Sequence, residues 1–195
     1  MRMRLAAPLL VGLVVVGASG IASRASRYVV VALLFSWLGD ILLTPSGDLF
    51  FRLGLVAFAV AQSFYIAAFR SPEGRRRPWN LRIAAPYALW WVVLVAVLAP
   101  KLGILTVAVA VYGALLLTMA ATSWRVGVVA GIGGLLFAVS DSLIALTSLG
   151  HLLEFSLSGA LIMATYSAGQ FLIVWNWTRP QTAIAPAEPE LSEGN

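Results

Sequence analysis

Long hydrophobic runs separated by short polar breaks dominate the chain. Seven of the runs approach or exceed the length of about 20 apolar residues that a membrane-spanning helix needs. They cover residues 5–22, 28–44, 50–69, 84–100, 102–121, 126–148 and 155–177. The breaks between them are rich in Gly, Pro and Ser, which favour turns. Since a bilayer offers no partner for open backbone groups, and the runs lack the alternation of strands, the pattern predicts an all-α, polytopic membrane helix bundle.

The amino-acid composition agrees with a membrane helix bundle and excludes several kinds of functional site. The chain of 195 residues is 61% hydrophobic, has a mean hydropathy of +0.92 and is 11% charged, whereas soluble domains are about 25% charged. It has no cysteine and one histidine, His151, which excludes disulfides, thiol catalysis and a soluble zinc-ligand set. We therefore expect no metal and no other cofactor.

One transmembrane domain is predicted over residues 1–178. The remaining segment, residues 179–195, is rich in Pro and Glu and is predicted to be a disordered tail.

The basic residues are distributed unevenly between the breaks. If the Arg-rich loop 70–82 is cytoplasmic, nine of the 13 Lys and Arg residues fall on that side and four on the other. The positive-inside rule then predicts a multi-pass protein of the cell inner membrane, with this loop and the C-terminus in the cytoplasm. The N-terminal run resembles a signal sequence, but the charge count favours a retained helix over residues 5–22. Nucleic-acid binding is not expected, because the basic stretch is short and lacks a folded module around it.

Two acids interrupt the hydrophobic runs, Asp40 in FSWLGDILL and Asp141 in LFAVSDSLIAL. A charged residue at the centre of a membrane helix costs roughly 2.5–3.5 kcal/mol on insertion scales. Such residues usually mark a functional site that faces a polar interior. The two predicted helices run in the same direction, and a faint internal repeat around the acids suggests a parallel duplication that would bring the two carboxyl groups together.

Further polar side chains follow helical spacing on the same predicted spans. Those that we expect to face the acids are Gln62, Tyr65, Ser140, Tyr166 and Gln170. The fourth and fifth spans hold no acid within them and are predicted to be lipid-facing filler, Tyr112 included. Gly127 and Gly131 form a small-xxx-small face on the sixth span, which predicts a close helix neighbour.

Four motifs in the same order carry a resemblance to a known family. They are Leu38-Gly39-Asp40, Ala61-Gln62-Ser63-Phe64-Tyr65, Ala138-Val139-Ser140-Asp141 and Tyr166-Ser167-Ala168-Gly169-Gln170. With their flanking residues they resemble the YhhN family of membrane proteins from about Pro8 to Val174. The family usually has eight spans and a Lys-Pro motif where this chain has Ala7-Pro8. The chain therefore looks as if it lacks the family's first helix, either because that helix is missing or because the true start lies further upstream. Many members carry His where this chain has Gln62 and Gln170, so a histidine proton carrier is not transferred to these positions.

The resemblance implies an activity, because the characterised animal members of the family are lysoplasmalogenases. These enzymes hydrolyse the vinyl ether of an alkenyl-glycerophospholipid to a fatty aldehyde and a glycerophospho-head group. The reaction protonates the β-carbon and lets water capture the oxocarbenium ion, and two carboxyl groups in different protonation states can cover these roles. We expect Asp40 and Asp141 to be the catalytic pair, with the order of acid and base open, and the five polar residues above to orient water or the head group. The expected partner is a membrane lysophospholipid.

Two other functions use buried acids in the same way. A small proton-coupled transporter or lipid carrier would use them as a proton relay. An intramembrane aspartyl protease also pairs two acids on helices, but its flanking motifs differ from those of this chain. An acid near a helix end can also simply reach the interface or bond to a neighbouring helix.

Overall fold

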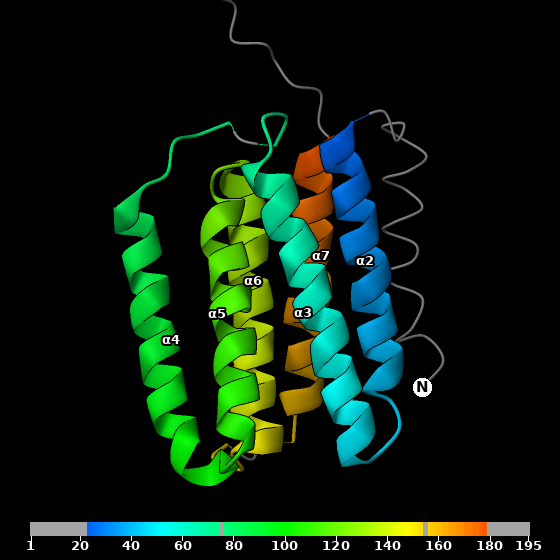
Figure 1. Cartoon of the computed structure of the whole chain (residues 1–195), viewed down its shortest axis with the longest axis vertical. Coiled ribbons are helices and arrows are strands. Elements are labelled where there is room, and N and C mark those ends of the chain that lie inside the picture. The colour runs from blue at the N-terminus through cyan, green and yellow to red at the C-terminus, as the bar shows by residue number, and fades with distance from the viewer. Residues whose placement is uncertain (1–22, 75, 154–155, 179–195) are drawn as a thin grey trace, which may run out of the picture.

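The computed structural model describes residues 23–74, 76–153 and 156–178. Within them the protein is a bundle of six long helices that run alternately up and down (Figure 1). No strand occurs in these three ranges. The helices are α2 (Arg24–Leu42), α3 (Asp48–Arg70), α4 (Leu81–Leu102), α5 (Leu105–Ser123), α6 (Val128–Ile144) and α7 (Ser158–Thr178), and a π-helical turn, η2 (Ala145–Leu149), extends α6.

The predicted fold class is confirmed, with one difference in the helix count. Six helices are long and apolar enough to cross a membrane, and they coincide with the last six of the seven predicted spans. The first predicted span, residues 5–22, and the predicted tail, residues 179–195, lie outside the described residues. The domain limits at residue 178 therefore stay a prediction.

Local interactions place the ends of the helices. The Ser23 hydroxyl accepts a hydrogen bond from the Ser26 amide at 3.1 Å, and Asn80 Oδ1 accepts one from the Arg82 amide at 2.9 Å. Both bonds satisfy a free amide in a first helical turn. On α3, Asp48 lies in the first turn and Arg70 in the last, which is the arrangement that the helix dipole favours.

Five of the helices form a closed ring, and α4 lies outside it. Around the ring α2 packs on α3, α3 on α5, α5 on α6 and α6 on α7. Two side-chain hydrogen bonds join α7 back to α2: Trp177 Nε1 donates to Ser26 Oγ at 3.2 Å, and the Tyr166 hydroxyl donates to Asp40 Oδ2 at 3.0 Å. Among the described helices, α4 packs mainly on α5 and η2, so most of its surface is left for lipid. The interior of the ring is the place where polar side chains are hidden from the bilayer.

Glycines allow the closest approach between ring helices. A Cβ atom on Gly133 of α6 would lie 2.7 Å from the Gly169 carbonyl oxygen of α7, and one on Gly169 would lie 2.8 Å from the Gly133 oxygen. Of the two glycines predicted to face a close neighbour, Gly127 lies against Asn176 of α7, whereas Gly131 lies against the Trp124 indole. The close backbone contact between α6 and α7 therefore lies at Gly133, two residues beyond Gly131.

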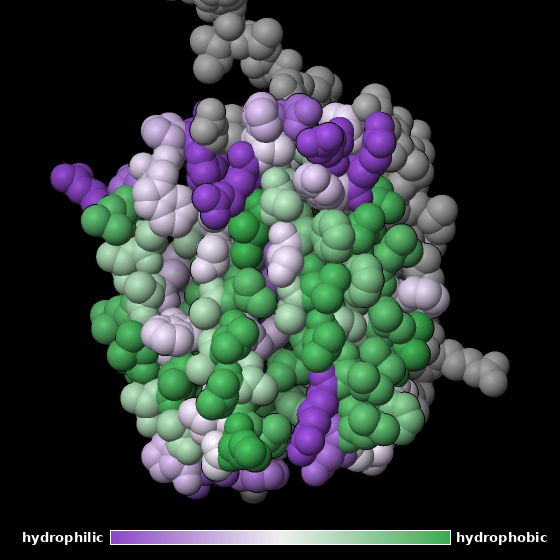
Figure 2. Space-filling view, in the orientation of Figure 1, coloured by the Kyte–Doolittle hydropathy of each residue, from purple (hydrophilic) through white to green (hydrophobic). Residues whose placement is uncertain are grey.

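Charge is concentrated at one end of the bundle. Figure 2 shows a hydrophobic belt around the molecule with hydrophilic residues mainly at its upper end. This arginine end is formed where α2 and α4 begin, α3 ends and α5 meets α6. Its described basic residues are Arg24, Arg27, Arg70, Arg76, Arg77, Arg82 and Arg125.

Candidate functional site

Asp40 and Asp141 lie inside the ring, toward the end of the bundle opposite the arginine end. Asp40 is two residues from the end of α2, and Asp141 is three residues from the end of α6. Both side chains are partly buried. Helices α2 and α6 run in the same direction, so both acids lie toward the same end of the bundle. The structure therefore places at one end of the bundle the two acids that the sequence singles out, although they are 101 residues apart in the chain.

A chain of hydrogen bonds leads from α3 through α7 to the first acid. The Tyr65 hydroxyl donates to Gln170 Oε1 at 2.5 Å, and Gln170 Nε2 donates to the Tyr166 hydroxyl at 3.4 Å. The Tyr166 hydroxyl in turn donates to Asp40 at 3.0 Å. Tyr65, Gln170 and Tyr166 are all buried. Because buried polar groups are costly unless they are satisfied, this network fixes the Asp40 carboxylate relative to α3 and α7.

The second acid has a partner of its own on α5, since the Tyr112 hydroxyl donates to Asp141 Oδ2. The interpretation of α5 as lipid-facing filler is therefore wrong at Tyr112. The residue looks unremarkable in the sequence because α5 carries no acid and no regular polar stripe. The available signal was the phenolic hydroxyl itself, which needs a hydrogen-bond partner when it lies at membrane depth.

Two other polar side chains in the interior have unused hydrogen-bonding capacity. Both amide atoms of Gln62 lack a hydrogen-bond partner among the described residues, and so does the Ser36 hydroxyl. The two residues are fully buried. Gln62 lies beside the Tyr112 hydroxyl, and Ser36 beside that of Tyr65. Because an unsatisfied buried amide is unfavourable, these atoms favour a polar occupant such as water or a ligand hydroxyl next to the acids.

Ser140, another predicted site residue, does not take part in the hydrogen bonds around the acids. Its hydroxyl donates to the Ile162 carbonyl oxygen on α7 at 3.0 Å. Ser140 is fully buried and thus ties α6 to α7 next to Asp141. Its expected part in orienting water or substrate stays a prediction.

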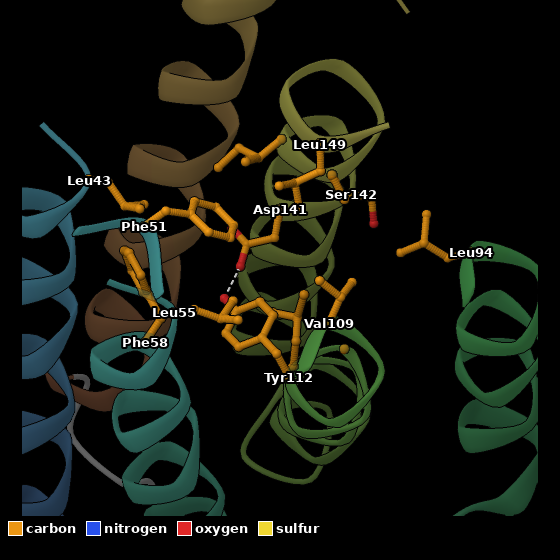
Figure 3. Close-up of a pocket in the computed structure, with 14 residues that line it drawn as sticks. Leu43, Phe51, Leu55, Phe58, Leu94, Val109, Tyr112, Asp141, Ser142 and Leu149 are labelled. Carbon is orange, nitrogen blue, oxygen red and sulfur yellow. Dashed lines mark hydrogen bonds between the residues drawn. The ribbon is translucent and has the colours of Figure 1, made fainter. Parts of the chain in front are cut away.

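A pocket opens beside Asp141 between α3, α4, α5 and α6 (Figure 3). Figure 3 places Asp141 and Tyr112 near its centre, Phe51 and Leu55 on one side and Leu94 on the opposite side. All but three of its lining residues are apolar or glycine, so a carboxyl group stands in the wall of a hydrocarbon-like cavity. The lining consists of Leu43, Phe51, Leu55, Phe58, Leu94, Val109, Tyr112, Gly113, Leu116, Asp141, Ser142, Ile144, Ala145 and Leu149.

The backbone of α6 changes its geometry immediately after Asp141. The α-helix ends at Ile144 and continues as the π-helical turn Ala145–Leu149, and both end residues of that turn line the pocket. His151, two residues beyond the turn, has a positive φ of 46°, which is uncommon outside glycine. Single π-helical turns are frequent at functional sites because they re-aim the side chains next to them.

The acids of this site do not form a metal-binding cluster in the described part of the chain. No group of three or more His, Cys, Asp or Glu side chains gathers there. What the arrangement offers chemically is two carboxyl groups, each held by a tyrosine hydroxyl, one of which, Asp141, stands in the wall of an apolar pocket.

This arrangement can be compared with known proteins. The sequence profile of the YhhN family matches residues 3–177. The chain belongs to the YhhN family. No solved structure matches the chain, so the geometry above has no experimental counterpart for comparison.

Two relatives of this YhhN protein are lysoplasmalogenases by name. One is lysoplasmalogenase TMEM86A of Bos taurus, which is 36% identical over 155 residues, covering 73% of this chain and 62% of the relative. The other is lysoplasmalogenase TMEM86A of Homo sapiens, which is 34% identical over 165 residues, covering 78% of this chain and 66% of the relative. The match thus spans slightly less than two thirds of each relative's length. Together with the six spanning helices, this relationship makes the chain a multi-pass membrane protein.

Proposed function

We propose that this protein is an integral-membrane hydrolase that cleaves the vinyl ether bond of alkenyl-glycerophospholipids, as the names of its relatives suggest. The observation that carries the proposal is the pair Asp40 and Asp141 toward one end of the bundle, each bound by a tyrosine hydroxyl, with Asp141 in the wall of an apolar pocket. A lipid substrate has an apolar chain and a polar head group. The site has an apolar pocket lining for the chain and buried polar side chains nearby for the polar part. The products are a fatty aldehyde and a glycerophospho-head group.

The chemistry requires an acid, an anion and a base. One carboxyl group protonates the β-carbon of the vinyl ether, and the other stabilises the oxocarbenium ion and removes a proton from the attacking water. The hemiacetal then collapses to aldehyde and alcohol. Tyr112 and Tyr166 hold the two carboxyl groups in place, while Gln62 has free donor and acceptor atoms to orient the water or the head group. Tyr65 and Gln170 support Tyr166 from behind.

Aldehyde release by the purified protein tests this function. The wild type in detergent is given an alkenyl lysophospholipid, and the fatty aldehyde is measured by mass spectrometry. The matched alkyl ether and the acyl ester serve as comparison substrates, because neither forms an oxocarbenium ion by protonation at carbon. Aldehyde from the vinyl ether alone is the expected result. Cleavage of the ester in preference to the vinyl ether would contradict the proposal.

A proton-coupled carrier is the second candidate, and one feature favours it. The hydrogen bonds from Tyr65 to Asp40 run along the bundle axis, as a proton relay would. Tyr65 lies five residues from the arginine end of α3, or about 8 Å. The detergent experiment separates the two functions, because a carrier releases no aldehyde and transports only between two compartments.

The uneven charge also supports a proposed orientation in the cell inner membrane. In this orientation the arginine end of the bundle lies on the cytoplasmic side. The loop 70–82 and the C-terminus then lie inside, as the positive-inside rule favours. Asp40 is 16 residues from Arg24 on α2, or about 24 Å along the helix. The acids are accordingly placed in the leaflet away from the cytoplasm.

Cysteine labelling checks this orientation, since the chain has no cysteine of its own. Pro72 and Ser46 are both exposed and lie at opposite ends of the bundle. In intact cells we expect Ser46→Cys to react with a membrane-impermeant maleimide and Pro72→Cys to react only after the membrane is permeabilised. The reverse pattern would place the arginine end outside and the acids in the cytoplasmic leaflet.

A further inference from the structure

The pocket beside Asp141 has an almost entirely apolar lining. Its apolar lining comes from four helices, and Asp141 is the carboxyl group in that lining, whereas Asp40 is absent from it. Asp40 instead ends the hydrogen-bonded network of α7. The two acids are therefore not equivalent, because one faces an apolar space and the other faces the polar interior.

The pocket also lies between two helices, α3 and α4, that have no extensive contact with each other. Helix α4 packs on α5 and η2, and α3 packs on α2 and α5, but the two helices do not form a packed interface with each other. Leu55 on α3 and Leu94 on α4 line the pocket from opposite sides (Figure 3). A lipid can therefore enter sideways between α3 and α4 without its chain leaving the apolar phase, which avoids the cost of exposing that chain to water.

We propose that this pocket holds the alkenyl chain of the substrate, and that this placement makes Asp141 the acid and Asp40 the base. The inference rests on the proposed vinyl ether hydrolysis. In the group R–CH=CH–O–R′ the chain R is attached to the β-carbon, which is the carbon that must receive the proton. With R in the pocket, that carbon lies at the wall that carries Asp141, and the ether oxygen and head group point toward Asp40.

The proton balance of the cycle closes with these roles. The carboxylic acid of Asp141 gives its proton to the β-carbon, and the C=C electron pair forms the new C–H bond and leaves the oxocarbenium ion R–CH₂–CH=O⁺–R′. Water adds to the α-carbon and loses a proton to the Asp40 carboxylate. In the collapse, the hemiacetal hydroxyl returns a proton to Asp141, while Asp40 protonates the departing oxygen of R′–OH. Tyr112, which donates to Asp141, stabilises the carboxylate that exists between these steps.

The absence of a side chain at Gly113 affects the space that the pocket offers to the alkenyl chain of the substrate. It lies in the pocket lining, one residue from Tyr112 on α5. A Cβ atom at this position would meet only the Trp91 ring, at 3.4 Å, which is ordinary contact. A Cβ is therefore accommodated beside Trp91, and the further atoms of a larger side chain take up space between Trp91 and the pocket lining.

The chain-length profile of Gly113→Leu tests the pocket assignment. Relative to the wild type, we expect kcat/KM for a long alkenyl chain of 16–18 carbons to fall by roughly tenfold or more, while that for a chain of 8–10 carbons changes little. The control Gly159→Leu lies on α7, where a new Cβ meets nothing within 4 Å. An unchanged profile in Gly113→Leu, with normal wild-type aldehyde release, overturns the pocket assignment alone. Absence of wild-type aldehyde release overturns the proposed function instead.

Azide tests the division between the two acids, because it attacks a cation without needing to lose a proton. Its addition gives an azido ether that is detected by mass, along with the loss of vinyl ether. We expect azide to restore substrate consumption in Asp40→Asn, in which Asp141 still protonates carbon, but not in Asp141→Asn. Any other pattern of rescue across the two variants overturns the assignment of acid and base.

Discussion

Replacing either intramembrane acid abolishes most of the aldehyde release: in Asp40→Asn and in Asp141→Asn we expect turnover of an alkenyl lysophospholipid to fall roughly 10²–10⁴-fold. Asparagine has the same shape and keeps an oxygen that can accept the hydrogen bonds from Tyr166 and Tyr112. It can neither deliver a proton to carbon nor remove one from water. The loss should therefore appear in kcat, since the apolar pocket that binds the chain is unchanged.

The measurement is steady-state aldehyde release by purified variants in the same detergent. Asp48→Asn is the matched control, because Asp48 is exposed in the first turn of α3 and asparagine is equally acceptable at a helix N-terminus. Its turnover should equal that of the wild type. Near-normal turnover in Asp40→Asn or Asp141→Asn, with the control intact, would remove that residue from the mechanism.

The six described spans could be predicted because each is a property of about 20 consecutive residues. Hydrophobicity over that length outweighs any local preference, so the predicted ranges and the observed helices agree apart from their ends. Asp40 and Asp141 could be found for a related reason. A charged residue within a long apolar run is costly in a membrane whichever helices surround it, so its position is evident from the sequence alone.

The partners of the acids depend on which helices meet, and that information is not local. Tyr112 binds Asp141 only because α5 packs on α6, and nothing near Tyr112 in the chain predicts that neighbour. Ser140 presents the opposite case. It is adjacent to Asp141 in sequence, but consecutive residues on a helix point about 100° apart, and its hydroxyl reaches the backbone of α7 instead.

The tight crossing of α6 and α7 leads to the second prediction, a loss of stability in Gly169→Val. A Cβ atom on Gly169 would lie 2.8 Å from the Gly133 carbonyl oxygen and 2.9 Å from the Phe137 amide nitrogen. Both are backbone atoms, which cannot rotate away, so the helices must separate. Overpacking of this kind costs about 1–3 kcal/mol, and the branched valine adds to the strain. We expect a clearly lower midpoint of thermal unfolding in detergent.

The same change should reach the proposed catalytic pair through α7. Tyr166 is three residues before Gly169 and Gln170 directly follows it, so a displaced α7 lengthens the contact between Tyr166 and Asp40. Turnover should fall even at temperatures where the variant is fully folded. Gly159→Val is the matched control on the same helix, because a Cβ there meets nothing within 4 Å, and it should keep both the unfolding midpoint and the turnover. If Gly169→Val unfolds at the wild-type temperature, α6 and α7 have room for a side chain at Gly133. In that case α7 does not position Asp40 through that contact.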